Sequence, residues 1–118
     1  MTKHHKISDQ RLHDALRYFG VNNSMLGYTD TFIGMKYIWE NQDRMRNLSR
    51  YVYPMIYAAT GRKVQAVITS IHGVACAAWE NARHHLKQYD PSLNAPPTNS
   101  EFLEILLQYL DDHATSQR

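Results

Sequence analysis

The stretch ATGRKVQAVITSIHGVACAAW, residues 59–79, constrains the fold of this chain more than any other segment. After Gly61, apolar residues recur at intervals of three and four, which places them on one face of an α-helix beginning near Lys63. They are Val64, Val67, Ile71, Val74, Ala75 and Ala78. We expect a short preceding helix to end at Thr60, because glycine readily adopts the left-handed conformation that terminates helices. Two helices joined this tightly, with glycine in the turn, are typical of a helix-turn-helix.

Upstream of this stretch, the pattern predicts two further helices. Ser8 is expected to cap a first helix that runs to about Phe19, where Gly20 stops it. The apolar residues of this helix form one stripe. A turn-rich segment over residues 20–30 follows, and either Thr29 or Asp30 is expected to cap the second helix.

Pro54 interrupts the third helical segment. Proline cannot donate a helical hydrogen bond, so either the helix kinks near Arg50 or a new helix starts with Pro54 at its first position. Near the C-terminus, Thr98 and Glu101 form a capping box before a repeat of apolar residues. We therefore predict an all-α fold, a single domain over residues 1–118 with five or six helices that include the helix-turn-helix, and a flexible segment at residues 1–7.

Composition narrows the class of protein. No stretch approaches the roughly 18 uninterrupted apolar residues that span a bilayer, and the N-terminus lacks the apolar segment of a secretory signal. The single cysteine, Cys76, excludes an internal disulfide, as is usual in a reducing compartment. We expect a cytoplasmic domain that makes no membrane contact.

Positive charge gathers in the middle of the chain. Between Arg44 and Trp79 there is no acidic residue, whereas five basic residues occur there: Arg44, Arg46, Arg50, Arg62 and Lys63. The first 43 residues are balanced in charge, and the last 39 are net acidic. Local positive charge of this kind attracts a polyanion such as nucleic acid, although an ordinary solvated surface is the alternative.

The sequence offers little for catalysis or metal binding. Cys76 and His72 lie four residues apart on one helix face, but a metal site needs three or four ligands in suitable geometry. There is no glycine-rich phosphate loop and no paired-carboxylate arrangement. We predict no enzyme activity, no metal and no cofactor.

Short motifs spread along the chain carry a resemblance to a known family. They are Gly20-Val21, Gly27-Tyr28, Tyr53-Pro54, Ala78-Trp79 and the hexamer PTNSEF at residues 97–102. Their spacing from Gly20 to Trp79 is that of the family without a gap. The chain resembles the C-terminal DNA-binding domain of the master response regulator that initiates sporulation in spore-forming Gram-positive bacteria.

The resemblance implies a six-helix domain that regulates transcription. Its fourth helix would enter the major groove of double-stranded DNA. It also implies self-association on tandem promoter boxes and contact with an RNA polymerase sigma factor, although the segment between Trp79 and PTNSEF is shorter here. In the family, a phosphoacceptor receiver domain normally precedes this domain. A chain of 118 residues has no room for one, which leaves a free-standing protein and an excised fragment both open.

The residues that would read DNA depart from the family pattern. Where the family carries Ser-Arg-Val-Glu-Arg-Ala-Ile-Arg, this chain carries residues 65–72, and every charged side chain is replaced. We predict that four residues of this helix face the bases and that four residues nearby bind phosphates. The base-facing set is Gln65, Ile68, Thr69 and His72, and the phosphate-binding set is Ser49, Arg50, Arg62 and Lys63. Since a good bidentate side-chain–base pair discriminates by roughly 1–3 kcal/mol, we expect an altered base preference.

An alternative function remains open at this point. An outward helix face without charge, centred on Ile68, is also what a helix-in-groove interaction module uses. On that interpretation the same scaffold has lost specific DNA binding and acts on a partner protein or as an antagonist.

Overall fold

The computed structural model describes residues 6–115, and these form helices without any strand. The α-helices are α1 (Asp9–Tyr18), α2 (Tyr28–Glu40), α3 (Leu48–Tyr51), α4 (Tyr53–Thr60), α5 (Val64–Tyr89) and α6 (Asn99–Thr115), and a 3₁₀ helix, η1 (Gln42–Arg46), lies between α2 and α3. The all-α prediction is confirmed. Of the segment expected to be flexible, residues 1–5 lie outside the described residues, and the side chain of Ile7 is buried in the core.

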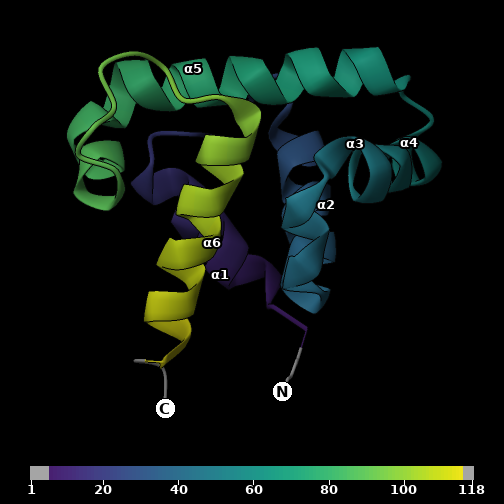
Figure 1. The fold of residues 1–118 in the computed structure, drawn as a ribbon, viewed down its shortest axis with the longest axis horizontal. Coiled ribbons are helices and arrows are strands. Elements are labelled where there is room, and N and C mark those ends of the chain that lie inside the picture. Colours follow the sequence, from purple (N-terminus) through teal and green to yellow (C-terminus); the bar gives the residue numbers. More distant parts are fainter. Residues whose placement is uncertain (1–5, 116–118) are drawn as a thin grey trace.

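Helix α5 extends along one side of the molecule, and the other helices pack beneath it (Figure 1). Helices α2 and α6 run away from α5, while α3 and α4 lie under its N-terminal half. The core fills the space enclosed by α1, α2, α5 and α6. Its fully buried large side chains include Leu12, Leu16, Phe19, Met35, Ile38, Ile71, Phe102, Leu103, Leu106 and Leu110.

Several helix boundaries follow the sequence predictions. The hydroxyl of Ser8 accepts a hydrogen bond from the Arg11 N–H and caps α1. Pro54 lies in the first turn of α4, so a new helix starts here as the second alternative for this proline predicted, although it begins one residue earlier, at Tyr53. At its other end α4 stops at Gly61, whose φ of +77° is the left-handed conformation expected there.

The predicted cap of α2 is wrong. The helix begins at Tyr28, and Gly27, with a φ of +94°, occupies the cap position without any side-chain hydrogen bond to the helix. Neither Thr29 nor Asp30 caps it, because Asp30 lies inside the first turn and its carboxylate is turned into the protein, where only 2% of the residue is exposed.

Helix α5 contains a break that the sequence did not locate. The backbone of Ala82 leaves the helical region, with φ of −145° and ψ of 41°. Residues 83–89 therefore form a separate helical segment that turns away from the main part of α5, as Figure 1 shows.

The capping box before α6 gives a first testable prediction. The Thr98 N–H donates to Glu101 Oε1 at 2.9 Å, and the Glu101 N–H donates to Thr98 Oγ1 at 3.1 Å. We expect Thr98→Ala to lower the free energy of unfolding by about 1 kcal/mol, because it leaves a helix N–H without its acceptor. Chemical denaturation measures this loss. The neighbouring exposed Ser100 serves as the control, and an equal loss in Ser100→Ala would contradict the assignment.

Candidate nucleic-acid interface

Helices α4 and α5 are joined by only three residues, 61–63. The Gly61 N–H donates to the Tyr57 carbonyl oxygen at 2.7 Å and closes α4. The Thr60 hydroxyl accepts from the Arg62 N–H at 3.0 Å and fixes the direction in which the chain leaves. This is the tight junction with glycine in the turn on which the helix-turn-helix prediction depends.

A buried carboxylate ties this turn to two helices. Asp30 Oδ2 accepts from Arg62 Nε at 2.9 Å and from the Ser70 hydroxyl at 2.7 Å. Because a buried carboxylate is costly unless it is paired, these two donors are what permit Asp30 to be 98% buried. The cluster of Asp30, Arg62 and Ser70, called here the Asp30 cluster, links α2, the turn and α5.

A second polar link holds α6 against α4 and α5. Asn99, the first residue of α6, donates from Nδ2 to the Tyr53 hydroxyl at 3.1 Å and to the Ile68 carbonyl oxygen at 3.0 Å. The PTNSEF hexamer contributed to the family resemblance, but no role was predicted for Asn99. Its partners lie 46 and 31 residues away, so no local pattern could have identified them.

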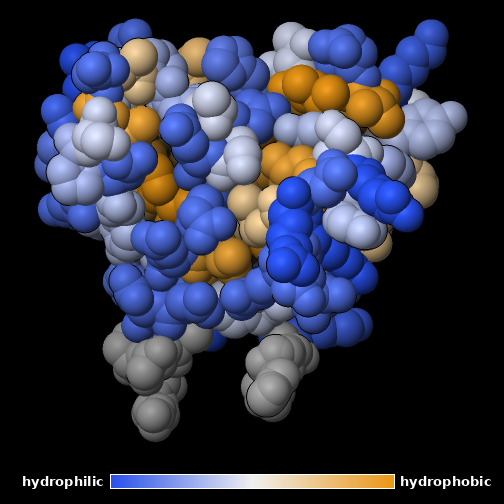
Figure 2. All heavy atoms as spheres, viewed as in Figure 1, coloured by the Kyte–Doolittle hydropathy of each residue, from blue (hydrophilic) through white to orange (hydrophobic). Residues whose placement is uncertain are grey.

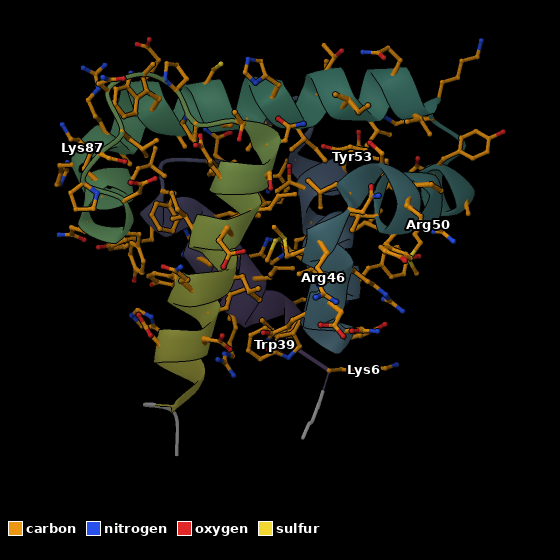
Figure 3. All side chains as sticks on the ribbon, viewed as in Figure 1. Lys6, Trp39, Arg46, Arg50, Tyr53 and Lys87 are labelled. Carbon is orange, nitrogen blue, oxygen red and sulfur yellow. The ribbon has the colours of Figure 1, made fainter. Side chains whose placement is uncertain are left out.

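The outward side of α5 carries three of the four predicted base-facing residues. Gln65, Thr69 and His72 are exposed, and this side of α5 points away from the rest of the molecule (Figures 1 and 3). Neither the core nor the acidic helix α6 covers it. Ile68 is half-buried and packs against the core, so it lies at the edge of the outward face rather than at its centre.

The basic residues of the middle segment fall into two groups. Arg62 is paired with Asp30, and Arg44 lies 3.7 Å from Glu40 and donates to the Tyr37 carbonyl oxygen. Within residues 6–115 no ion pair involves the other three, Arg46, Arg50 and Lys63, which are exposed. The positive charge presented to solvent is therefore smaller than the sequence suggested.

The three remaining cations do not all lie at α5. Lys63 immediately precedes the helix. Arg50 lies on α3, beneath the N-terminal half of α5, with its guanidinium 5.5 Å from the centre of the Tyr51 ring (Figure 3). Arg46 lies farther from α5, in front of α2, and Figure 2 shows hydrophilic residues gathered over this part of the surface. Ser49 is exposed beside Arg50. Lys63, Ser49 and Arg50 are thus better placed near α5 than Arg46.

The described part of the chain was also compared with the requirements of a metal site and of a membrane-spanning helix. Cys76 Sγ lies 3.5 Å from His72 Nε2, but among residues 6–115 no three potential ligands come together. No helix in the same range has the length and apolar character needed to cross a bilayer.

A comparison with known protein families shows to which family the chain belongs. The family model described as "Sporulation initiation factor Spo0A C terminal" matches residues 12–110, from α1 to α6. The chain belongs to this family. A search of curated proteins and a search of solved structures each found no match.

Membership of the Spo0A C-terminal family establishes the general function. The chain is a DNA-binding effector domain of the sporulation-regulator type, in a family of transcription-factor domains rather than of enzymes. In this chain, the motif residues that carried the resemblance lie in the scaffold. Gly27 packs against α5, Tyr53 and Asn99 join α4, α5 and α6, and Ala78 and Trp79 are buried.

Proposed function

We propose that this domain binds double-stranded DNA by placing the N-terminal half of α5 in the major groove, with a base preference different from that of its family. The observation that carries the proposal is the outward face of α5, where Gln65, Thr69 and His72 are exposed and residues 65–72 include no Lys, Arg, Asp or Glu. An α-helix fits the major groove, where each base pair presents its own pattern of donors, acceptors and methyl groups. These side chains would therefore read bases by hydrogen bonds and methyl contacts rather than by charge.

Each of the three side chains suits a different base feature. The Gln65 amide can both donate and accept, which matches the N6 and N7 edge of adenine. The Thr69 methyl group fits against a thymine methyl, and its hydroxyl can bond a base edge. His72 can donate to guanine or to a phosphate. Ile68, at the edge of this face, would contact thymine methyls.

Phosphate binding is assigned to the start of α5 and to α3. Lys63 is exposed, and the first turn of α5 contains no acidic residue and receives no side-chain cap. Uncapped N–H groups at a helix N-terminus, together with the helix dipole, favour an anion. Ser49 and Arg50 would bind the neighbouring part of the backbone. Arg62 was also predicted to bind phosphate, but it is paired with Asp30 and is therefore left out of this set.

The test is a titration of duplex binding at several salt concentrations, after selection of bound sequences from a random duplex pool. With about three phosphates neutralised, the logarithm of affinity should fall with the logarithm of salt at a slope near −2 to −3. Lys63→Gln should weaken binding to every duplex and reduce the slope by about 0.9. Thr69→Ala should instead change the selected sequence and leave the slope unchanged. If copies bind side by side, the selected duplexes will contain tandem repeats.

A folded protein that bound no duplex even at low salt would contradict this proposal. The alternative, a protein-interaction or antagonist module, would then take its place. Ile68→Glu would then be expected to abolish partner binding while Lys63→Gln left it intact.

A further inference from the structure

The position of Arg62 between a buried carboxylate and solvent has a functional consequence. Its side chain is 38% exposed at the start of α5, where DNA phosphate is expected, yet its Nε is bound to Asp30 Oδ2. The next residue, Lys63, is exposed and has no acidic partner within the described range. Of these two neighbouring cations at the same helix end, only Arg62 is paired with a carboxylate within the described residues.

We propose that Asp30 acts as a built-in competitor of DNA phosphate for Arg62, and so limits the part of DNA affinity that is independent of sequence. This inference rests on the proposed DNA-binding function. Its chemical basis is that a carboxylate and a phosphate both satisfy a guanidinium by charge-assisted hydrogen bonds. Asp30 already occupies one side of Arg62, in a buried site that solvent screens less than an exposed one.

Counterion release gives the expected contribution of each cation to the salt dependence of DNA affinity. Each phosphate that a protein cation neutralises contributes about 0.9 to the slope of log affinity against log salt. A phosphate that approached the exposed edge of Arg62 would be repelled by the negative charge of Asp30 behind it. Arg62 should therefore add little to this slope, in contrast to Lys63.

Asp30→Asn is the variant that tests the proposal. Asparagine keeps a side-chain oxygen that can accept from Arg62 Nε and from the Ser70 hydroxyl, but it removes the charge. We expect this variant to bind random-sequence duplex about five- to tenfold more tightly at about 0.1 M salt, with the slope steeper by about 0.9. If Asp30 were only structural, the same change would leave binding unchanged or weaken it.

Asp14→Asn is the matched control. It makes the same change in charge and also releases an arginine, because Asp14 pairs with Arg17 at 3.2 Å in α1. Both of those side chains are at least half exposed, and α1 lies on the side of α5 opposite to its outward face (Figure 1). We expect its affinity to change less than twofold. An equal gain in affinity in both variants would mean that the net charge of the protein alone causes the effect, and it would overturn the proposal.

The double variant Asp30→Asn/Arg62→Gln decides the question even if the single variant folds poorly. It leaves no buried charge without a partner, and we expect it to keep the wild-type salt slope. A slope smaller by about 0.9 would show that Arg62 already binds a phosphate in the wild-type protein, and it would overturn the proposal. Failure of the proposed function is a separate result, namely that neither the wild type nor Asp30→Asn binds any duplex.

Discussion

Gly27→Ala is expected to destabilise the protein by about 3–5 kcal/mol, a large share of the roughly 5–15 kcal/mol by which folded domains are usually stable. A Cβ atom at this position would lie 2.3 Å from the carbonyl oxygen and 2.7 Å from the carbonyl carbon of Ser70. These atoms belong to the backbone of α5, so no side-chain rotation can relieve the contact. The φ of +94° adds a conformational cost for any residue with a Cβ.

Gly73→Ala is the control, because it is the same substitution in the helix against which Gly27 packs. A Cβ at Gly73 would meet no atom within 4 Å, and this residue lies in the interior of α5. Alanine is favoured over glycine in a helix by up to about 1 kcal/mol, so this variant should be as stable as the wild type or more stable. Chemical denaturation compares the two. A loss of less than about 1 kcal/mol in Gly27→Ala would mean that α2 and α5 are not packed this closely.

Arg62→Ala should also cost several kcal/mol, about 3 by comparison with other broken buried pairs. Among the described residues, the substitution leaves the carboxylate of Asp30, 2% exposed, with the Ser70 hydroxyl as its one side-chain donor. The same loss is not expected for Arg17→Ala, since the pair of Arg17 with Asp14 is exposed and worth less than about 1 kcal/mol.

A second substitution separates an uncompensated charge from lost packing. If the cost of Arg62→Ala comes from the carboxylate, then adding Asp30→Asn should restore most of the stability, since replacing both members of a buried pair is far less costly than removing one. Thermal denaturation of the wild type, the two single variants and the double variant measures the coupling. Additive losses would show that Asp30 and Arg62 contribute independently.

The features that could be predicted from the sequence are those set by local patterns. The apolar stripe of α5, the Thr98–Glu101 capping box and the Gly61 end of α4 each depend on residues within a few positions of one another. The incorrect cap of α2 has a non-local cause. Asp30 has the residue type and position of a helix cap, but its partners Arg62 and Ser70 are 32 and 40 residues away.

In the candidate site, too, features set by local patterns could be predicted and features set by distant contacts could not. The exposure of Gln65, Thr69 and His72 follows from the period of α5 and could be predicted. Ile68 could not be placed as accurately, because it borders the buried stripe and its burial depends on the rest of the fold. Arg62 was predicted to be a free cation, because no residue near it in the sequence indicates an ion pair with α2. That Gln65, Thr69 and His72 contact bases remains a prediction.

The outward face of α5 has a consequence for how such a domain can diversify. Within the described residues, Gln65 and Thr69 lie outside the core and outside the side-chain links that hold the helices together. Substitutions at such positions usually change stability by less than about 0.5 kcal/mol. Such side chains can therefore be exchanged without loss of the fold, and if they contact bases as proposed, the exchange would change the preferred operator.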